Sequence, residues 1–175
     1  VPLLFDDNGR DIKLMSKDGY SCHVCVLRPK STGSVSLISA NPADYPEIDF
    51  NFFSHPDDKQ VMIDGIKQVR KILAAPAFDG HRGEELHPGV EIQSDDAIFE
   101  KSLERLGTVF HPVGTCKMGN DDMAVVDSEL RVHGIQNLRV IDASIMPNLV
   151  SGNTNAPTIA IAEKAAGMIL AQSLG

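Results

Sequence analysis

The sequence predicts an α+β fold, because β-compatible runs occupy its N-terminal part while helical patterns occupy its middle and its C-terminal end. Residues 23–28 and 34–39 are compatible with strands, and residues 29–33, which contain proline and glycine, are typical of a turn. We therefore expect these two runs to pair as a β-hairpin. Residues 49–53 are expected to form one more short extended segment.

A first helix is predicted to follow a capping residue at Ser54 or His55, with Pro56 in its first turn. Apolar residues then recur at steps of four, three and four, which places them on one helical face: Met62, Ile66, Val69 and Leu73. The helix is expected to bury that face and to end before Pro76, since proline cannot continue the hydrogen-bond pattern.

A second, shorter helix is predicted between Ser94, a good N-cap residue, and Gly107, a common helix terminator. Its expected apolar anchors are Ile98, Leu103 and Leu106. Extended segments are expected after it, at residues 109–118, 125–126, 130–132 and, as a buried strand, 138–141. A last helix is predicted to open at Asn155 or Ala156, with Pro157 in its first turn, and to run to about Ala171.

Composition limits the possible partners. The chain has 175 residues, of which 42% are apolar, so it can bury a core. Its formal net charge of −8 argues against nucleic acid and against an anionic membrane surface, because both require clustered Lys and Arg. The longest apolar stretch, residues 156–174, is interrupted by Glu163, Lys164 and Gln172, so no transmembrane segment is expected.

The cysteines do not predict a disulfide framework, because their number, three, is odd. Cys22 and Cys25, with His23 between them, resemble a two-cysteine metal hook. No second cysteine pair exists, and in a strand these two side chains would point to opposite faces. We therefore expect no metal site.

Among the six histidines, His111 is the candidate for proton transfer. It stands in the run FHPVGTCKMG at residues 110–119, where Pro112 and Gly114 restrict the backbone. An unperturbed histidine titrates at about pH 6.5, so it can take or give a proton near neutrality. A structural role at a strand end is the alternative, and solvated or capping roles are expected for the other histidines.

Two further positions could meet His111 in one site. Asn155 could cap the last helix, or it could face a pocket where the free amides and partial positive charge of the helix start would stabilise an anion. Asp142 and Ala143 follow the predicted buried strand, where a small residue would let a ligand approach the backbone. An ordinary strand-to-turn aspartate is the alternative there.

Several familiar catalytic and nucleotide-binding motifs are absent. The sequence has no G-x-S-x-G elbow, no P-loop and no H-E-x-x-H. It also has no G-x-G-x-x-G, so it lacks a dinucleotide fingerprint of its own.

Six ordered runs together resemble the C-terminal part of the glucose-methanol-choline (GMC) family of flavin oxidoreductases. They are RPKS at 28–31, IDFNFFS at 48–54, RGEE at 82–85, FHPVGTCKMG at 110–119, LRVIDAS at 138–144 and SGNTNAPT at 151–158. The sequence is most similar in character to bacterial FAD-dependent alcohol and choline dehydrogenases. This resemblance covers nearly the whole chain.

The resemblance implies how the fold is organised. Residues 1–120 would belong to a substrate-binding domain, an antiparallel sheet flanked by helices. Residues 121–175 would add the C-terminal strand and helix of an FAD-binding domain whose N-terminal Rossmann half is absent from this sequence.

The resemblance also implies the site and its chemistry. His111 and Asn155 would be catalytic, and the residues facing FAD would be Asp142, Ala143, Asn153, Ala156 and Pro157. His111 would accept or polarise the hydroxyl proton of an alcohol, and Asn155 would hydrogen-bond the same oxygen. The carbon would then pass a hydride to flavin N5, leaving an aldehyde.

An uncharged primary alcohol is the expected substrate. Choline is the alternative, but a quaternary ammonium needs an aromatic or acidic cage, and this chain has no Trp and only two Tyr. An electron acceptor of unknown identity would reoxidise FAD. A non-catalytic binding or structural module is the alternative of another class. We expect a cytoplasmic protein, with peripheral association to a bacterial inner membrane as an alternative, and self-association of the isolated chain.

Overall fold

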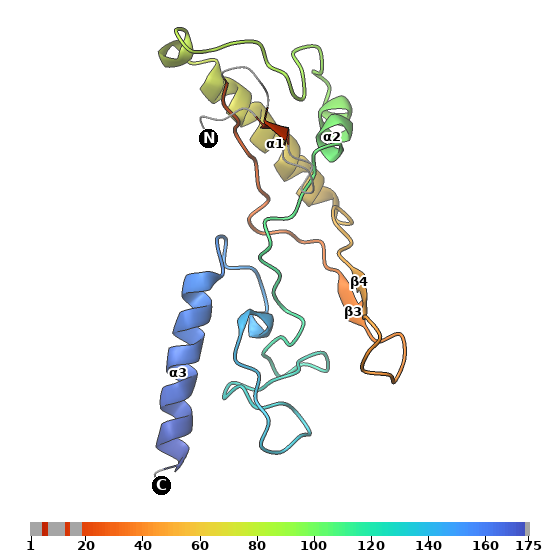
Figure 1. Cartoon of the computed structure of the whole chain (residues 1–175), viewed down its shortest axis with the longest axis vertical. Coiled ribbons are helices and arrows are strands. Elements are labelled where there is room, and N and C mark those ends of the chain that lie inside the picture. The colour runs from red at the N-terminus through yellow and green to blue at the C-terminus, as the bar shows by residue number, and fades with distance from the viewer. Residues whose placement is uncertain (1–4, 7–12, 15–18, 174–175) are drawn as a thin grey trace. The chain divides into compact units, whose positions relative to one another are not determined.

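The computed structural model describes residues 5–6, 13–14 and 19–173, and it confirms the α+β fold class (Figure 1). Its elements follow in this order: β1 (Phe5–Asp6), β2 (Lys13–Leu14), β3 (Ser34–Ser36), β4 (Glu47–Asp49), α1 (Pro56–Leu73), the 3-10 turn η1 (Pro76–Phe78), α2 (Asp95–Leu103), the 3-10 turn η2 (Ala143–Ile145) and α3 (Asn155–Ser173). β1 pairs with β2 and β3 with β4, both antiparallel.

Two compact units make up the chain. The first consists of Val1–Val26 and Phe52–Val109 and carries α1 and α2. The second consists of Leu27–Asn51 and Phe110–Gly175 and carries β3, β4 and α3. Across the described part of the chain, no helix combines the length and the apolar character that crossing a membrane requires.

α1 of the first unit begins where the sequence predicts. Nδ1 of His55 accepts a hydrogen bond from the Asp57 amide at 3.2 Å, and Pro56 opens the helix. Acidic side chains in the first turn and basic ones in the last complement the helix dipole. The predicted apolar face turns inward, since Met62 is 8% exposed and Ile66, Val69 and Leu73 are half-buried. The most buried side chain of the helix, Ile63 at 1%, lies outside the predicted set.

α2 packs against α1 (Figure 1). The predicted cap is confirmed, since Ser94 Oγ accepts from the Ala97 amide at 3.3 Å. Ile98 and Phe99 bury themselves against Ile63, and Phe53 meets Phe99 edge-on at 5.2 Å between ring centroids. The expectation that Leu103 anchors the helix is wrong: Leu103 is 39% exposed and ends α2, and Phe99 fills the core instead.

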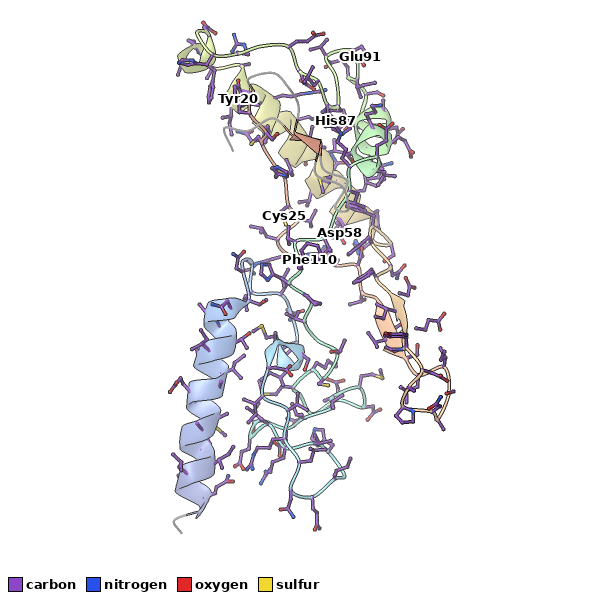
Figure 2. The ribbon with its side chains drawn as sticks, viewed as in Figure 1. Tyr20, Cys25, Asp58, His87, Glu91 and Phe110 are labelled. Carbon is purple, nitrogen blue, oxygen red and sulfur yellow. The ribbon has the colours of Figure 1, made fainter. Side chains whose placement is uncertain are left out.

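The loop that carries His87 and Glu91 (Figure 2) is tied to α1 by Arg70. The guanidinium binds the Glu85 carboxylate through Nε at 3.0 Å and Nη2 at 2.7 Å. Its Nη1 donates to the Ile92 carbonyl at 2.8 Å, and its Nη2 donates to the Gly89 carbonyl at 2.9 Å. One side chain therefore holds both ends of an eight-residue loop, from 85 to 92, against the helix.

The predicted hairpin of residues 23–28 with residues 34–39 is wrong. Residues 23–28 form no strand, and β3 pairs with β4 in the register Ser34–Asp49, Val35–Ile48 and Ser36–Glu47. Gly33 explains this pairing, because a Cβ there would lie only 2.0 Å from the Asp49 carbonyl oxygen. The glycine therefore serves a close approach of two backbones. Beyond Asp49 the expected extended segment is also wrong, since Asn51 and Phe53 adopt positive φ.

The second unit has its own core of Val126, Leu130, Ile145 and Ala165, with Ala165 supplied by α3. The strands predicted at 125–126, 130–132 and 138–141 appear only as isolated bridges, such as Val126–Val132 and Arg131–Arg139. Positive φ at Leu130 and Asn137 interrupts the extended backbone, which prevents longer ladders. The segment 138–141 is also less buried than predicted, because Leu138 is 46% exposed.

Candidate active site

His111 lies in a tightly constrained segment of the second unit. The residue before it, Phe110, has φ +60°, and Gly114 has φ +90°, a region that favours glycine. The amides of Cys116 and Met118 then donate to the carbonyls of Ser144 and Ile145 at 3.0 and 2.8 Å. The His111 segment is thus hydrogen-bonded to the segment that contains Asp142 and Ala143. The imidazole itself is half-buried.

α3 starts at Asn155, as predicted, but Asn155 is not its cap. The Thr154 carbonyl accepts from the Thr158 amide at 3.0 Å and from the Thr158 hydroxyl at 2.6 Å. Thr154 is therefore the N-cap residue, and Asn155, Ala156 and Pro157 are the first three residues of the helix. The capping expectation for Asn155 is wrong, because the first helical turn closes one residue earlier.

His111 and the start of α3 come together through Thr154. Nδ1 of His111 lies 3.1 Å from Thr154 Oγ1 and 3.5 Å from the Thr154 amide nitrogen. His111 therefore lies against the start of α3, as expected. The residue that it contacts there, Thr154, is one that the sequence reasoning did not single out. A signal was available: Pro157, three residues after Thr154, lacks the amide that an N-cap hydroxyl often binds.

Asn153 and Asn155 flank Thr154. Both side chains are exposed, and within the described residues neither forms a hydrogen bond. Neither side chain is therefore committed to another group among the described residues. Ala156 is exposed and Pro157 half-buried, so the first turn of α3 presents its backbone without bulky side chains.

Asp142 ends an extended segment and opens η2. Its Oδ1 accepts from the amide and the hydroxyl of Ser144, at 2.8 and 2.5 Å. This bond orients the exposed carboxylate and leaves Ala143 as a small, half-buried side chain next to it. The arrangement agrees with both interpretations of Asp142, as a turn residue and as a ligand-facing one.

The loop between η2 and α3 is anchored by Arg28. Its Nε donates to the hydroxyl of Ser151, whose φ is +65°. Arg28 belongs to the RPKS run, so this contact joins two runs separated by 123 residues. Sequence reasoning gave Arg28 no part in the site, because no local pattern links it to Ser151.

The donor set fits the redox-active ring of FAD. The first amides of α3 are free of intrahelical partners and carry the positive end of a helix of 19 residues. Such a group stabilises negative charge, which is what a two-electron-reduced flavin ring develops. Ala143 and Ala156 leave space for a planar group to approach the backbone.

A separate hollow of about 510 Å³ lies elsewhere in the second unit. It is lined by residues 131–139 together with Asp127 and Gln172, and it contains none of the predicted site residues. In the part of the chain that the structure describes, no group of three or more His, Cys, Asp or Glu side chains is placed to hold a metal ion. Cys22 and Cys25 are exposed free thiols.

Comparison with known protein families identifies the family of this chain. Residues 29–162 match the sequence profile described as GMC oxidoreductase, which is most of the chain. The chain belongs to the GMC oxidoreductase family. The resemblance that the six sequence runs indicate is thereby confirmed.

Individual relatives agree with this family. An alcohol dehydrogenase [acceptor] of Pseudomonas putida is 51% identical over 170 residues, covering 97% of this chain and 30% of that protein. An oxygen-dependent choline dehydrogenase of Escherichia coli K12 is 46% identical over 172 residues, covering 98% of this chain and 31% of that protein. This chain therefore spans about 30% of the length of these relatives.

The fold has counterparts among solved structures of the family. A formate oxidase of Aspergillus oryzae, in a variant studied for its FAD modification, superposes with a TM-score of 0.78 at 35% identity. The match covers 84% of this chain and 26% of that one. A pyridoxine 4-oxidase from Mesorbium loti superposes with a TM-score of 0.74 at 37% identity, covering 80% and 27%.

Proposed function

We propose that this chain supplies the active-site histidine and the flavin-facing helix start of an FAD-dependent enzyme that oxidises a primary alcohol to an aldehyde. The observation that carries the proposal is the contact between His111 and Thr154, which sets a proton-transfer group against the N-terminus of α3. Membership of the GMC oxidoreductase family and the named alcohol-oxidising relative support the same reaction.

Each residue has a role in this proposal. FAD would lie against Asp142, Ala143, Asn153, Ala156 and Pro157. When bound, FAD supplies the acceptor for the hydride that leaves the carbinol carbon. His111 takes the hydroxyl proton, and an asparagine beside Thr154 hydrogen-bonds the same oxygen. Asn155 is the residue that the sequence indicates, and Asn153 is equally close to Thr154 along the chain.

The functional division of the chain also belongs to this proposal. Residues 1–120 would contribute mainly to substrate binding and residues 121–175 to the flavin side. The compact units of the structure have other boundaries, since His111 and α3 share one unit with Leu27–Asn51. Both catalytic partners therefore come from a single unit, which favours a fixed geometry between them.

His111→Ala tests the proposal in the FAD-loaded full-length protein. General-base catalysis contributes roughly 10²–10⁴-fold, so we expect the rate constant for flavin reduction by a primary alcohol to fall at least about tenfold. Anaerobic stopped-flow absorbance measures this constant. His133→Gln is the matched control, because His133 lies in the same unit but contacts the Gly119 carbonyl at 3.1 Å instead of Thr154. Unchanged reduction in His111→Ala would remove His111 from the mechanism.

Choline is the second candidate substrate, because relatives that align with 97% and 98% of this chain are named choline dehydrogenases. Flavin reduction by a panel of uncharged alcohols and choline separates the two candidates.

A separate acceptor would reoxidise FAD. We place the protein in the cytoplasm or at the inner face of a bacterial membrane. Cell fractionation tests this location. A non-catalytic module is the remaining alternative, and flavin reduction by any alcohol would exclude it.

A further inference from the structure

Thr154 occupies an unusual position for an N-cap residue. The side-chain oxygen of an N-cap threonine ordinarily accepts a hydrogen bond from the amide of the second or third helical residue. The third residue of α3 is Pro157, which has no amide hydrogen. Among the described residues, the Thr154 hydroxyl instead has one hydrogen-bonding contact, to Nδ1 of His111 at 3.1 Å.

The groups around Nδ1 determine which hydrogen bond forms. A neutral imidazole carries its proton on one nitrogen and a lone pair on the other. The Thr154 carbonyl is already occupied by the amide and hydroxyl of Thr158. The Thr154 amide is aimed at Nδ1 as a donor, which would use Nδ1 as an acceptor. Its 3.5 Å distance exceeds the usual 2.7–3.2 Å range of such bonds, so the Thr154 hydroxyl at 3.1 Å is the closer partner of Nδ1. The hydroxyl, with lone pairs that no capping amide uses, is the acceptor within reach of an Nδ1 hydrogen.

We propose that Thr154 is a positioning residue whose hydroxyl accepts the Nδ1 hydrogen of His111 and thereby leaves the lone pair on Nε2. This inference rests on the proposed function, because it names the nitrogen that receives the alcohol proton. In the proposed oxidation that proton would move to Nε2, and FAD, when bound, would supply the acceptor for the hydride of the carbinol carbon, so that an aldehyde is released. The imidazolium that results keeps its Nδ1 hydrogen bond to Thr154, so the ring does not need to turn during the reaction.

Pro157 and Thr154 act together in this account. If the third residue of the helix carried an amide hydrogen, that amide would compete with His111 for the Thr154 oxygen. The sequence Thr-Asn-Ala-Pro at 154–157 therefore directs a capping hydroxyl outward to a catalytic side chain. The same hydrogen bond fixes the ring plane of His111, which is half-buried against the helix start.

The tautomer can be measured directly by NMR. The chain is labelled with ¹⁵N in its histidine rings, and long-range ¹H–¹⁵N spectra are recorded at a pH where histidine side chains are neutral. A His111→Gln sample assigns the His111 signals among the six histidines. We expect wild-type His111 to carry its hydrogen on Nδ1. A hydrogen on Nε2 in the wild-type protein would overturn the inference without any further variant.

Two substitutions isolate the hydroxyl. Thr154→Val keeps the branched shape and removes the hydroxyl, so the hydrogen of His111 should redistribute toward Nε2. Thr154→Ser keeps the hydroxyl and should retain the wild-type tautomer. A Thr154→Val spectrum that still shows the hydrogen on Nδ1 would contradict the inference. The wild-type spectrum remains decisive if Thr154→Val does not fold.

Flavin reduction in the FAD-loaded full-length protein gives the functional readout. We expect Thr154→Val to lower the rate constant by about tenfold, as part of the general-base contribution, and Thr154→Ser to recover most of it. Failure of Thr154→Ser to recover activity would mean that Thr154 acts only through packing. The two hypotheses separate cleanly: unchanged reduction in His111→Ala refutes the proposed function, whereas the NMR tautomer tests Thr154 independently of activity.

Discussion

Replacement of Arg70 by methionine should destabilise the first unit by about 2–4 kcal/mol. The guanidinium donates to two backbone carbonyls, and hydrogen bonds from charged groups contribute about 1.5–3 kcal/mol each when they are shielded from water. The bidentate pair with Glu85 adds about 1 kcal/mol, because the two side chains are still 19% and 28% exposed. Rehydration of the freed carbonyls and burial of the methionine stem offset part of this loss.

Tyrosine fluorescence can follow this unit alone. The chain has no Trp and two tyrosines, Tyr20 in the first unit and Tyr45 in the second. Tyr20 packs 5.9 Å from Phe78 between ring centroids, whereas Tyr45 is 89% exposed. A Tyr45→Phe background therefore leaves Tyr20 as the reporter, and urea titration of that background gives the free energy of unfolding.

Two controls define the result. Arg70→Lys keeps the charge but cannot make the forked contacts, so about half of the loss should remain. Lys101→Met removes an exposed pair with Glu104 and should cost less than about 1 kcal/mol. If Arg70→Met changes the free energy of unfolding no more than Lys101→Met does, the Arg70 contacts do not hold the loop.

Two further predictions concern pH and assembly. The Asp127 carboxylate accepts a hydrogen bond from the Arg131 amide, and this bond is the main cause of the lowered pKa of Asp127. The carboxylate therefore stabilises the fold above its unfolded pKa of about 3.9. This stabilisation is lost as the pH falls through the lower pKa of the folded state. Asp127→Asn should therefore lower the melting temperature at neutral pH but not at the acid end of a pH series, and equal loss at all pH values would contradict this. The isolated chain should self-associate, because apolar side chains such as Leu37 and Leu170 are 85% and 62% exposed. Light scattering should give a concentration-dependent mass above 18.9 kDa, and a constant monomer mass would refute the prediction.

Local patterns predicted the helices well. The start of α1 follows from Pro56 and the acidic first turn. Its buried face follows from apolar residues that recur every three or four positions, beginning with Met62. The N-cap of α2 at Ser94 was also predicted correctly from the sequence. These features depend on residues three or four positions apart, which is the range that a single sequence reports.

Pairing between distant segments was the part that could not be predicted. The sequence suggests a turn at residues 29–33, but Gly33 is there to let the backbone approach Asp49, sixteen residues away. The bridges among residues 118–139 are interrupted at Leu130 and Asn137, whose positive φ no propensity signals. Such choices depend on tertiary contacts that outweigh local preference.

The candidate site shows the same division. His111 and the start of α3 could be selected from sequence, because their motifs are local and their chemistry is recognisable. Thr154, the residue that joins them, was not selected, because its hydrogen bond to His111 spans 43 positions and the one local signal, Pro157, shows only that the cap hydroxyl lacks its usual amide partner. The assignment of the helix cap to Asn155 failed because one residue of register separates a cap from the first helical turn.

The most direct test of the account is flavin reduction by alcohol with and without deuterium on the reacting carbon. The FAD-loaded full-length protein is mixed anaerobically with a primary alcohol, and flavin absorbance is followed by stopped flow. We predict that the flavin bleaches and that deuterium at the carbinol carbon slows the bleaching, because that carbon–hydrogen bond breaks as hydride leaves. A flavin that stays oxidised with every alcohol tried, choline included, would contradict the proposed reaction.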